Sequence, residues 1–194
     1  MARRKGLTFY QKKNKLNSRL LKDIMEMIVG GVVAVFLAFV IVFSIGMCTS
    51  VIGDSMEPTL YNGQRILMNR IMYRLSTPKR GDVIVFLPNG NQNSHYYVKR
   101  VVGLPGETIQ IKEGRVYIDG ILLEESEELD KMIDAGIAQN ELELAVDEFF
   151  VLGDNRNSSE DSRSGNIGAV NKDTIIGKAW FHMGTEDEGM GLIE

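Results

Sequence analysis

The pattern of apolar and polar positions divides the chain into two parts. Residues Met27–Gly53 include no Asp, Glu, Lys or Arg, and the centre of this stretch, Val32–Phe43, is almost entirely apolar. A helix that crosses the hydrocarbon core of a bilayer needs about 20 apolar residues, and a helix buried in a small domain is rarely so long and so apolar. The pattern predicts one transmembrane anchor over residues 27–49.

Beyond this stretch, short apolar runs bounded by Gly, Asn and Asp are typical of β-strands. No helix-length segments alternate with them, which favours a mainly β domain over a doubly wound α/β fold. One segment differs, because Ser126 is suited to cap a helix and Gly136 to end it, with Leu129, Met132 and Ile133 on one face. Strands are predicted at residues 83–86, 96–98, 108–111, 115–118, 149–152 and 175–181, with a turn at 112–114.

Charge is unevenly distributed along the chain. The net charge is −4, but the first 26 residues carry +6 and the remainder −10. Because Lys and Arg beside a span stay in the cytoplasm, we predict a single-pass cell-membrane protein with a basic cytoplasmic segment at 1–26. The domain at 50–185 would lie on the outer face, with an acidic, solvated insertion at about 124–147 and a tail at 186–194. The acidic balance argues against nucleic acid as a partner.

A removable signal peptide fits the N-terminal segment less well, because its apolar run exceeds the usual ~7–15 residues. Cys48 loosely fits a lipoprotein cleavage site, but the preceding Met47 is a poor match to the small residue required there. As the single cysteine, Cys48 excludes an internal disulfide and a multi-cysteine metal site. The two histidines lack zinc-ligand spacing and no phosphate-binding loop is present, so we predict neither metal nor cofactor.

Two residues suggest hydrolytic chemistry. Ser55 follows the uncharged run and, taken alone, is an ordinary turn serine, whereas Lys99 lies inside an apolar strand-like run. Taken alone, Lys99 is an ordinary outward-facing lysine. A serine hydroxyl needs a base, and at the usual pKa of ~10.4 only about one lysine in 2,500 is neutral at pH 7. Desolvation within an apolar strand would lower that pKa and make a Ser-Lys pair chemically competent.

The polar segment Gly153–Arg163 has the composition of a surface loop. Asp161 and Arg163 are two residues apart, which in a strand would place them on one face, but an exposed pair contributes only ~0–1 kcal/mol. This segment alone indicates no function.

Together, these segments resemble the bacterial type I signal peptidases, a family of membrane-anchored Ser-Lys endopeptidases, in their small Gram-positive-like form. The resemblance implies a coiled, largely antiparallel β domain that rests on the membrane surface. Its motifs follow the anchor in order: Ser-Met-x-Pro-Thr-Leu at 55–60, Arg-Gly-Asp-Val at 80–83, Lys-Arg-x-Val-Gly-Leu-Pro-Gly-Glu at 99–107, Gly-Asp-Asn-Arg-x-x-Ser-x-Asp-Ser-Arg at 153–163 and Ile-Gly-Lys-Ala at 176–179.

The resemblance also assigns roles by position. Ser55 matches the nucleophile, Lys99 the general base, and Ser159 a serine whose hydroxyl orients the lysine amine. Two supporting ion pairs are implied, Asp161 with Arg163 and Asp154 with Arg100. Where some members have a serine that donates to the oxyanion, this chain has Gly53, and loss of such a donor can cost about 100- to 1,000-fold in rate. The implied substrate-binding residues are Val51, Ile52, Gly53, Met56, Leu60, Tyr97 and Val98.

The sequence therefore predicts a membrane-bound serine endopeptidase that cleaves signal peptides from exported preproteins after small residues of the Ala-x-Ala type. Its predicted partners are these preproteins and membrane lipid, with the secretion channel as a further candidate. Ser55 closely follows the span, and at ~3.3 Å per residue it cannot lie far from the bilayer. Three alternatives remain: a hydrolase with His95 or His182 as base, a non-catalytic anchored β module that binds extended peptides, and a self-cleaving repressor-type Ser-Lys protease, which would carry a DNA-binding head.

Overall fold

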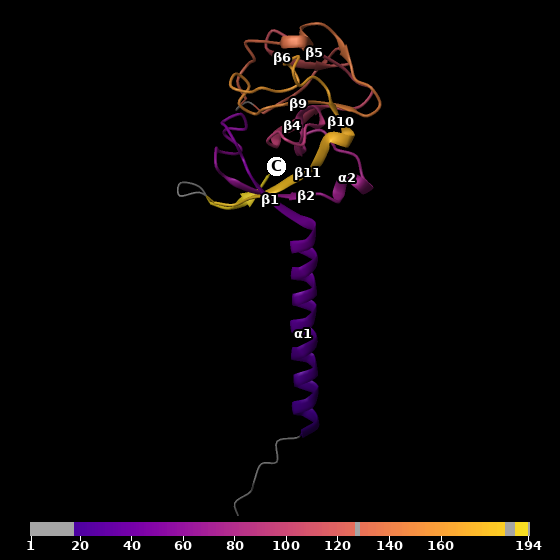
Figure 1. Cartoon of the computed structure of the whole chain (residues 1–194), viewed down its shortest axis with the longest axis vertical. Coiled ribbons are helices and arrows are strands. Elements are labelled where there is room, and N and C mark those ends of the chain that lie inside the picture. The colour runs from indigo at the N-terminus through magenta and orange to yellow at the C-terminus, as the bar shows by residue number, and fades with distance from the viewer. Residues whose placement is uncertain (1–17, 127–128, 185–188, 194) are drawn as a thin grey trace, which may run out of the picture. The chain divides into compact units, whose positions relative to one another are not determined.

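The N-terminal unit contains one long helix. The structure, a computed structural model, describes residues 18–126, 129–184 and 189–193, and the chain divides into units at residues 1–43 and 44–194. Helix α1 spans Ser18–Ile45 (Figure 1), and its side chains from residue 19 to 40 are exposed. Of the helices described, it alone is long and apolar enough to cross a membrane. It ends before the predicted anchor does, so Gly46–Thr49 lie in a strand.

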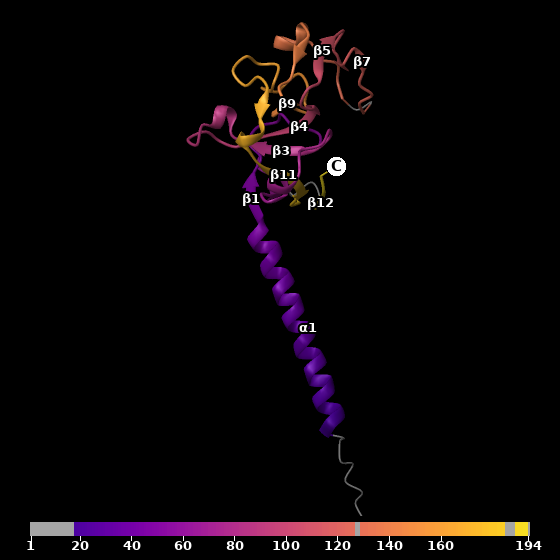
Figure 2. The same ribbon diagram turned by 90° about the vertical axis from the view of Figure 1, so that its right-hand side faces the viewer.

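The second unit consists of two antiparallel sheets (Figures 1 and 2). The larger sheet has eight strands in the order β1-β2-β11-β3-β4-β9-β10, with β12 paired to β11. These strands are β1 (Gly46–Ser50), β2 (Arg65–Asn69), β3 (Val83–Phe86), β4 (Tyr97–Gly103), β9 (Glu148–Leu152), β10 (Val170–Asn171), β11 (Ile175–His182) and β12 (Gly191–Leu192).

The smaller sheet has four strands in the order β7-β6-β5-β8. It lies at one end of this unit, with β1 and β11 at the other end and β4 and β9 between them (Figures 1 and 2). Its strands are β5 (Thr108–Lys112), β6 (Arg115–Ile118), β7 (Ile121–Leu122) and β8 (Leu142–Glu143). The short helical turns of the unit are α2 (Met72–Leu75), η1 (Pro88–Gly90), η2 (Gly136–Gln139) and η3 (Lys172–Thr174).

Strands β3 and β4 form the centre of the larger sheet. All four residues of β3, Val-Ile-Val-Phe, are buried, as expected for a short continuous apolar run. Strand β4 pairs with β3 on one side and with β9 on the other, and its register places Lys99 opposite Ile84. A lysine is thereby held in the middle of an apolar sheet, with 4% of its surface exposed.

The mainly β fold with one N-terminal apolar helix confirms the fold class predicted from the sequence. Each predicted strand is present, with ends that differ by two residues at most, except that the run at 96–98 belongs to the longer β4. The predicted turn joins β5 to β6 through Glu113 and Gly114, which both have positive φ, as a tight hairpin requires.

The helix predicted at Ser126–Gly136 is wrong, because the described residues of this segment contain no α-helix and Gly136 begins the short turn η2 instead of ending a helix. The N–H groups of Met132 and Ile133 donate to Gly114 O and Asn157 Oδ1, partners distant in sequence, rather than to carbonyls four residues earlier. Met132 is 5% exposed and Ile133 is 89% exposed, so they do not share a face. Tertiary contacts override the local helical pattern here.

The interpretation of residues 124–147 as a solvated insertion without a partner also needs correction. Met132, Ala138 and Leu144 are buried in an apolar cluster with residues of β5, β6 and β9. Glu125 forms an ion pair with Arg156, whose side chain is 1% exposed. Most described residues of the segment are exposed, as predicted, but these contacts attach it to the domain core.

Candidate active site

Ser55 lies in a tightly closed loop between β1 and β2. The base of the loop is fixed by hydrogen bonds from Val51 N to Gln64 O and from Gly63 N to Val51 O, both 2.8 Å. Gly53 has a φ of +85°, a conformation that glycine adopts without strain, and its N–H donates to Asn62 Oδ1. The loop returns the chain upon itself and presents the hydroxyl of Ser55 toward β4.

Lys99 reaches Ser55 from the centre of β4. Its Nζ donates a hydrogen bond to Ser55 Oγ at 2.6 Å. The same Nζ lies 5.5 Å from the centre of the Tyr97 ring, on the face of the strand that both residues share. A neutral amine at this distance is positioned to accept the hydroxyl proton.

Burial is the main influence on the charge of Lys99. It lowers the pKa of this amine to about 8, from an ordinary value of 10.5. The carboxylates of Asp161, Glu160 and Asp154 raise the pKa, and the guanidinium of Arg163 lowers it. With a pKa of about 8, about one amine in ten is neutral at pH 7, several hundred times the fraction for an exposed lysine.

The polar segment 153–163 packs against the loop of Ser55. Asn155 N donates to Ser55 O at 3.1 Å, and Asn155 Nδ2 donates to Asp54 O at 3.2 Å. Gly153 packs closely between Ser55 and Ser159, and only glycine fits there. A Cβ at this position would lie 2.4 Å from Ser55 O and 2.2 Å from Ser159 Oγ. The hydroxyl of Ser159 is buried and has no hydrogen-bond partner among the described residues, so it makes no bond to Lys99.

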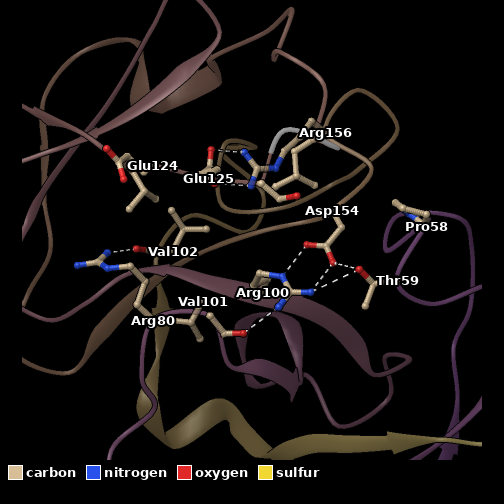
Figure 3. A pocket seen from close by; sticks show the side chains of 14 residues that line it. Pro58, Thr59, Arg80, Arg100, Val101, Val102, Glu124, Glu125, Asp154 and Arg156 are labelled. Atoms are coloured by element: carbon tan, nitrogen blue, oxygen red, sulfur yellow. Dashed lines mark hydrogen bonds and ion pairs between the residues drawn. The ribbon is translucent and has the colours of Figure 1, made fainter. Parts of the chain in front are cut away.

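Both predicted ion pairs of this segment are formed, and the carboxylate of each is buried. Arg163 Nε lies 2.8 Å from Asp161 Oδ1, and the Asp161 side chain is fully buried. Arg100 Nη2 lies 2.7 Å from Asp154 Oδ2, with Thr59 Oγ1 donating to the same oxygen at 2.6 Å (Figure 3). The segment is thus not a simple surface loop, and Asp161 and Arg163 meet in a turn rather than along a strand.

A cavity of about 300 Å³ opens at Ser55 and Lys99. Five of the seven predicted binding residues line it, namely Val51, Ile52, Gly53, Tyr97 and Val98. The other two, Met56 and Leu60, are fully buried and pack behind the cavity in an apolar cluster with Val51 and Val98. The structure therefore brings Ser55, Lys99 and most of the expected cavity walls to one place.

Known proteins resemble this chain over most of its length. The family model described as "Signal peptidase, peptidase S26" matches residues 24–183. The chain belongs to this family. It therefore falls among the signal peptidases, and helix α1 is consistent with the membrane anchoring of such proteins.

Individual relatives cover most of the chain. Signal peptidase I T of Bacillus subtilis (strain 168) is 35% identical over 160 residues, which are 77% of this chain and 80% of the relative. Signal peptidase I of Bacillus licheniformis is 33% identical over 175 residues, or 87% and 90%. A crystal structure of a signal peptidase I from Enterococcus faecalis V583 is 30% identical, with a TM-score of 0.41, and covers 53% of this chain and 97% of that one.

Several residues of this candidate site were not predicted from the sequence. Asp54, Ser158 and Glu160 also line the cavity, as does His95, which the sequence suggested only as an alternative base. Neither histidine hydrogen-bonds to Ser55 in the part of the chain that the structure describes, and His182 instead contacts Gln64 at 2.8 Å. Asn155 could have been found, since it lies in a recognised motif, whereas no signal in the sequence marks Glu160 as a neighbour of Ser55.

Proposed function

We propose that this chain is a membrane-bound serine endopeptidase that removes N-terminal signal peptides from exported preproteins by a Ser-Lys dyad. The observation that carries the proposal is the 2.6 Å contact between Lys99 Nζ and Ser55 Oγ in a sheet that shields the amine from water. Membership of the signal peptidase family supports the reaction class, and this contact supports the roles of the two residues.

In the proposed reaction, Ser55 Oγ attacks the scissile carbonyl while the neutral amine of Lys99 takes the hydroxyl proton. The ammonium so formed protonates the leaving amine, and the same amine then activates the water that hydrolyses the acyl-enzyme. Ser55 N–H donates no hydrogen bond to the described residues, so it is available to stabilise the oxyanion. Gly53 supplies no side-chain donor for this purpose.

The cavity suits an extended substrate with small side chains. Val51, Ile52 and Val98 give it apolar walls, and its volume of about 300 Å³ is at the low end for ligand sites. Alternate residues of an extended chain point to the same side, so the first and third residues before the scissile bond would enter the cavity. The proposed partners are therefore preproteins with an Ala-x-Ala site.

Membrane attachment would assist this reaction. We place the N-terminus in the cytoplasm and the β domain on the outer face, from the basic residues that precede the span. Enzyme and preprotein held in one bilayer meet at a raised effective concentration. Membrane lipid is thus a proposed partner, and the secretion channel a further one.

A change in the residue that precedes the scissile bond tests the substrate class. With the full chain in detergent, Ala→Leu at this position of an Ala-x-Ala preprotein is expected to lower kcat/KM about 100-fold, because the small cavity excludes the side chain. Leu at the middle position is the control and is expected to stay within about threefold, since it points away. Equal cleavage of all three would contradict the proposal, as would binding without turnover, which indicates a peptide-binding module.

The pH dependence of cleavage tests the amine. Because Lys99 acts only when neutral, kcat/KM is expected to rise with pH and to level off above its pKa of about 8. Glu160→Gln removes a carboxylate that raises this pKa, so the acid limb should move to lower pH. Glu143→Gln, an exposed change in the smaller sheet, should leave the profile unchanged. A profile without an acid limb would exclude Lys99 as the base.

A further inference from the structure

Arg156 is an unusual feature of the domain core. It is the largest side chain that is almost fully buried, with 2% of its surface exposed. Its Nη1 and Nη2 donate to Glu125 Oε2 and Oε1 at 2.9 and 2.5 Å, a bidentate ion pair drawn in Figure 3. A buried cation without a compensating charge is costly, so Glu125 is what allows Arg156 to remain in the core.

The buried guanidinium closes the turn that carries the site's polar residues. Arg156 Nε donates to Gly153 O at 3.1 Å, which links the two ends of the four-residue turn 153–156. The backbone oxygen of Arg156 accepts from Arg163 Nη2 at 2.6 Å. The turn is therefore held by two arginines, each in an ion pair: Arg156 with Glu125, and Arg163 with Asp161.

The turn 153–156 also holds the backbone of Ser55. Asn155 lies between Gly153 and Arg156, and its N–H and side-chain amide donate to Ser55 O and Asp54 O. The position of Ser55, and with it the direction of Ser55 N–H, thus depends on where the turn places Asn155. The route from Glu125 to Ser55 passes through Arg156, the turn and Asn155, with a hydrogen bond at each non-covalent step.

The segment after Glu125 adds a second attachment next to the first. Asn157 Oδ1 accepts from Ile133 N at 2.9 Å, and Asn157 Nδ2 donates to Lys131 O at 3.0 Å. Glu124, the neighbouring carboxylate, lines the same cavity of about 600 Å³ as Glu125 but is exposed (Figure 3). Of the two adjacent acidic residues, one is structurally tied to the turn and the other is a natural control.

We propose that Glu125 is a positioning residue for the proposed Ser55 chemistry, acting through its ion pair with Arg156 on the turn that fixes the backbone of Ser55. The inference rests on the proposed function and adds a residue from the acidic segment to it. Glu125 does not touch the substrate cavity, so its effect is expected on the chemical step rather than on substrate binding.

The first test compares Glu125→Gln with Glu124→Gln in the full chain, with an Ala-x-Ala preprotein as substrate. Glu125→Gln is expected to lower kcat about 10- to 100-fold, because displacement of a reacting group by about 1 Å costs up to about 100-fold. KM should stay within about twofold, and the pH at which the acid limb falls should not move. Glu124→Gln should match the wild type. Wild-type kcat in Glu125→Gln would overturn the inference.

A second variant separates positioning from stability. Glu125→Leu with Arg156→Met removes both buried charges, and apolar replacement of a buried ion pair is often neutral or stabilising. This double variant is expected to unfold at a temperature no lower than Glu125→Gln does, and still to show the lowered kcat. Recovery of kcat to the wild-type value would overturn the inference, since the pair would then only stabilise the fold.

If Glu125→Gln fails to fold, kcat of the double variant alone decides whether the ion pair positions Ser55 or only stabilises the fold. Failure of the wild-type chain to cleave the preprotein would contradict the proposed function instead, so the two proposals can fail separately.

Discussion

Lys99→Ala is expected to lower kcat for preprotein cleavage by about 10,000-fold or more while the domain stays folded, as for loss of one member of a catalytic unit that acts as a whole. Without the amine, nothing within hydrogen-bond distance of Ser55 Oγ in the described chain can take its proton. Alanine also removes a desolvated cation from an apolar sheet, so the thermal midpoint is expected to hold or to rise. Turnover and unfolding measured on the same preparation separate these two effects.

Lys99→Arg tests whether Lys99 acts as a base or only supplies a positive charge. The guanidinium keeps a positive charge but does not deprotonate at any pH of the assay, so this variant is expected to be as inactive as Lys99→Ala. Lys112→Ala, on an exposed position of β5, controls for the loss of a lysine and should retain full activity. Activity in Lys99→Arg above a tenth of the wild type would mean that Lys99 supplies only charge, and the dyad would be wrong.

Strands with strong local patterns could be predicted, and strands without them could not. β3 is a continuous apolar run and β6 follows a tight turn, so their own residues identify them. Most of β1, Gly46–Thr49, was assigned to the anchor because it continues the uncharged stretch with no charged residue to mark a boundary. It becomes a strand by pairing with β2, which begins 15 residues after β1 ends, and such pairing is invisible to a local pattern.

The chemistry of the site was predictable to the extent that it lies in continuous motifs. Ser55 and Lys99 are identified by the residues beside them, and the structure brings them together from loop and strand. The burial of Asp161 and Asp154 was not foreseen, because a turn-rich polar segment resembles an exposed loop until its tertiary partners are known. Glu125 shows most clearly what a sequence cannot predict. Its partner Arg156 lies 31 residues away, and nothing in the sequence distinguishes Glu125 from the adjacent Glu124.

Gly153→Ala is the substitution that tests the packing of the site most severely. A single methyl group at this position would meet Ser159 Oγ at 2.2 Å, Ser55 O at 2.4 Å and Ser159 Cβ at 2.6 Å. The carbonyl belongs to the backbone of Ser55, the proposed nucleophile, and cannot move without moving Oγ and the N–H group. We expect a loss of kcat of at least about 100-fold, since a shift of about 1 Å has that effect, and a loss of stability of about 1–3 kcal/mol from overpacking.

The matched control for this substitution is Gly165→Ala, where the added methyl group would meet only Ile137 Cγ2, at 4.0 Å, and activity should be unchanged. Gly153→Ala combined with Ser159→Gly removes the two contacts with Ser159 but keeps the contact with Ser55 O. Recovery of kcat in this double variant would show that Ser159 alone needs the space at Gly153. A persistent loss would show that close packing against the carbonyl of Ser55 is what requires glycine. Wild-type kcat in Gly153→Ala itself would contradict the geometry described for the site.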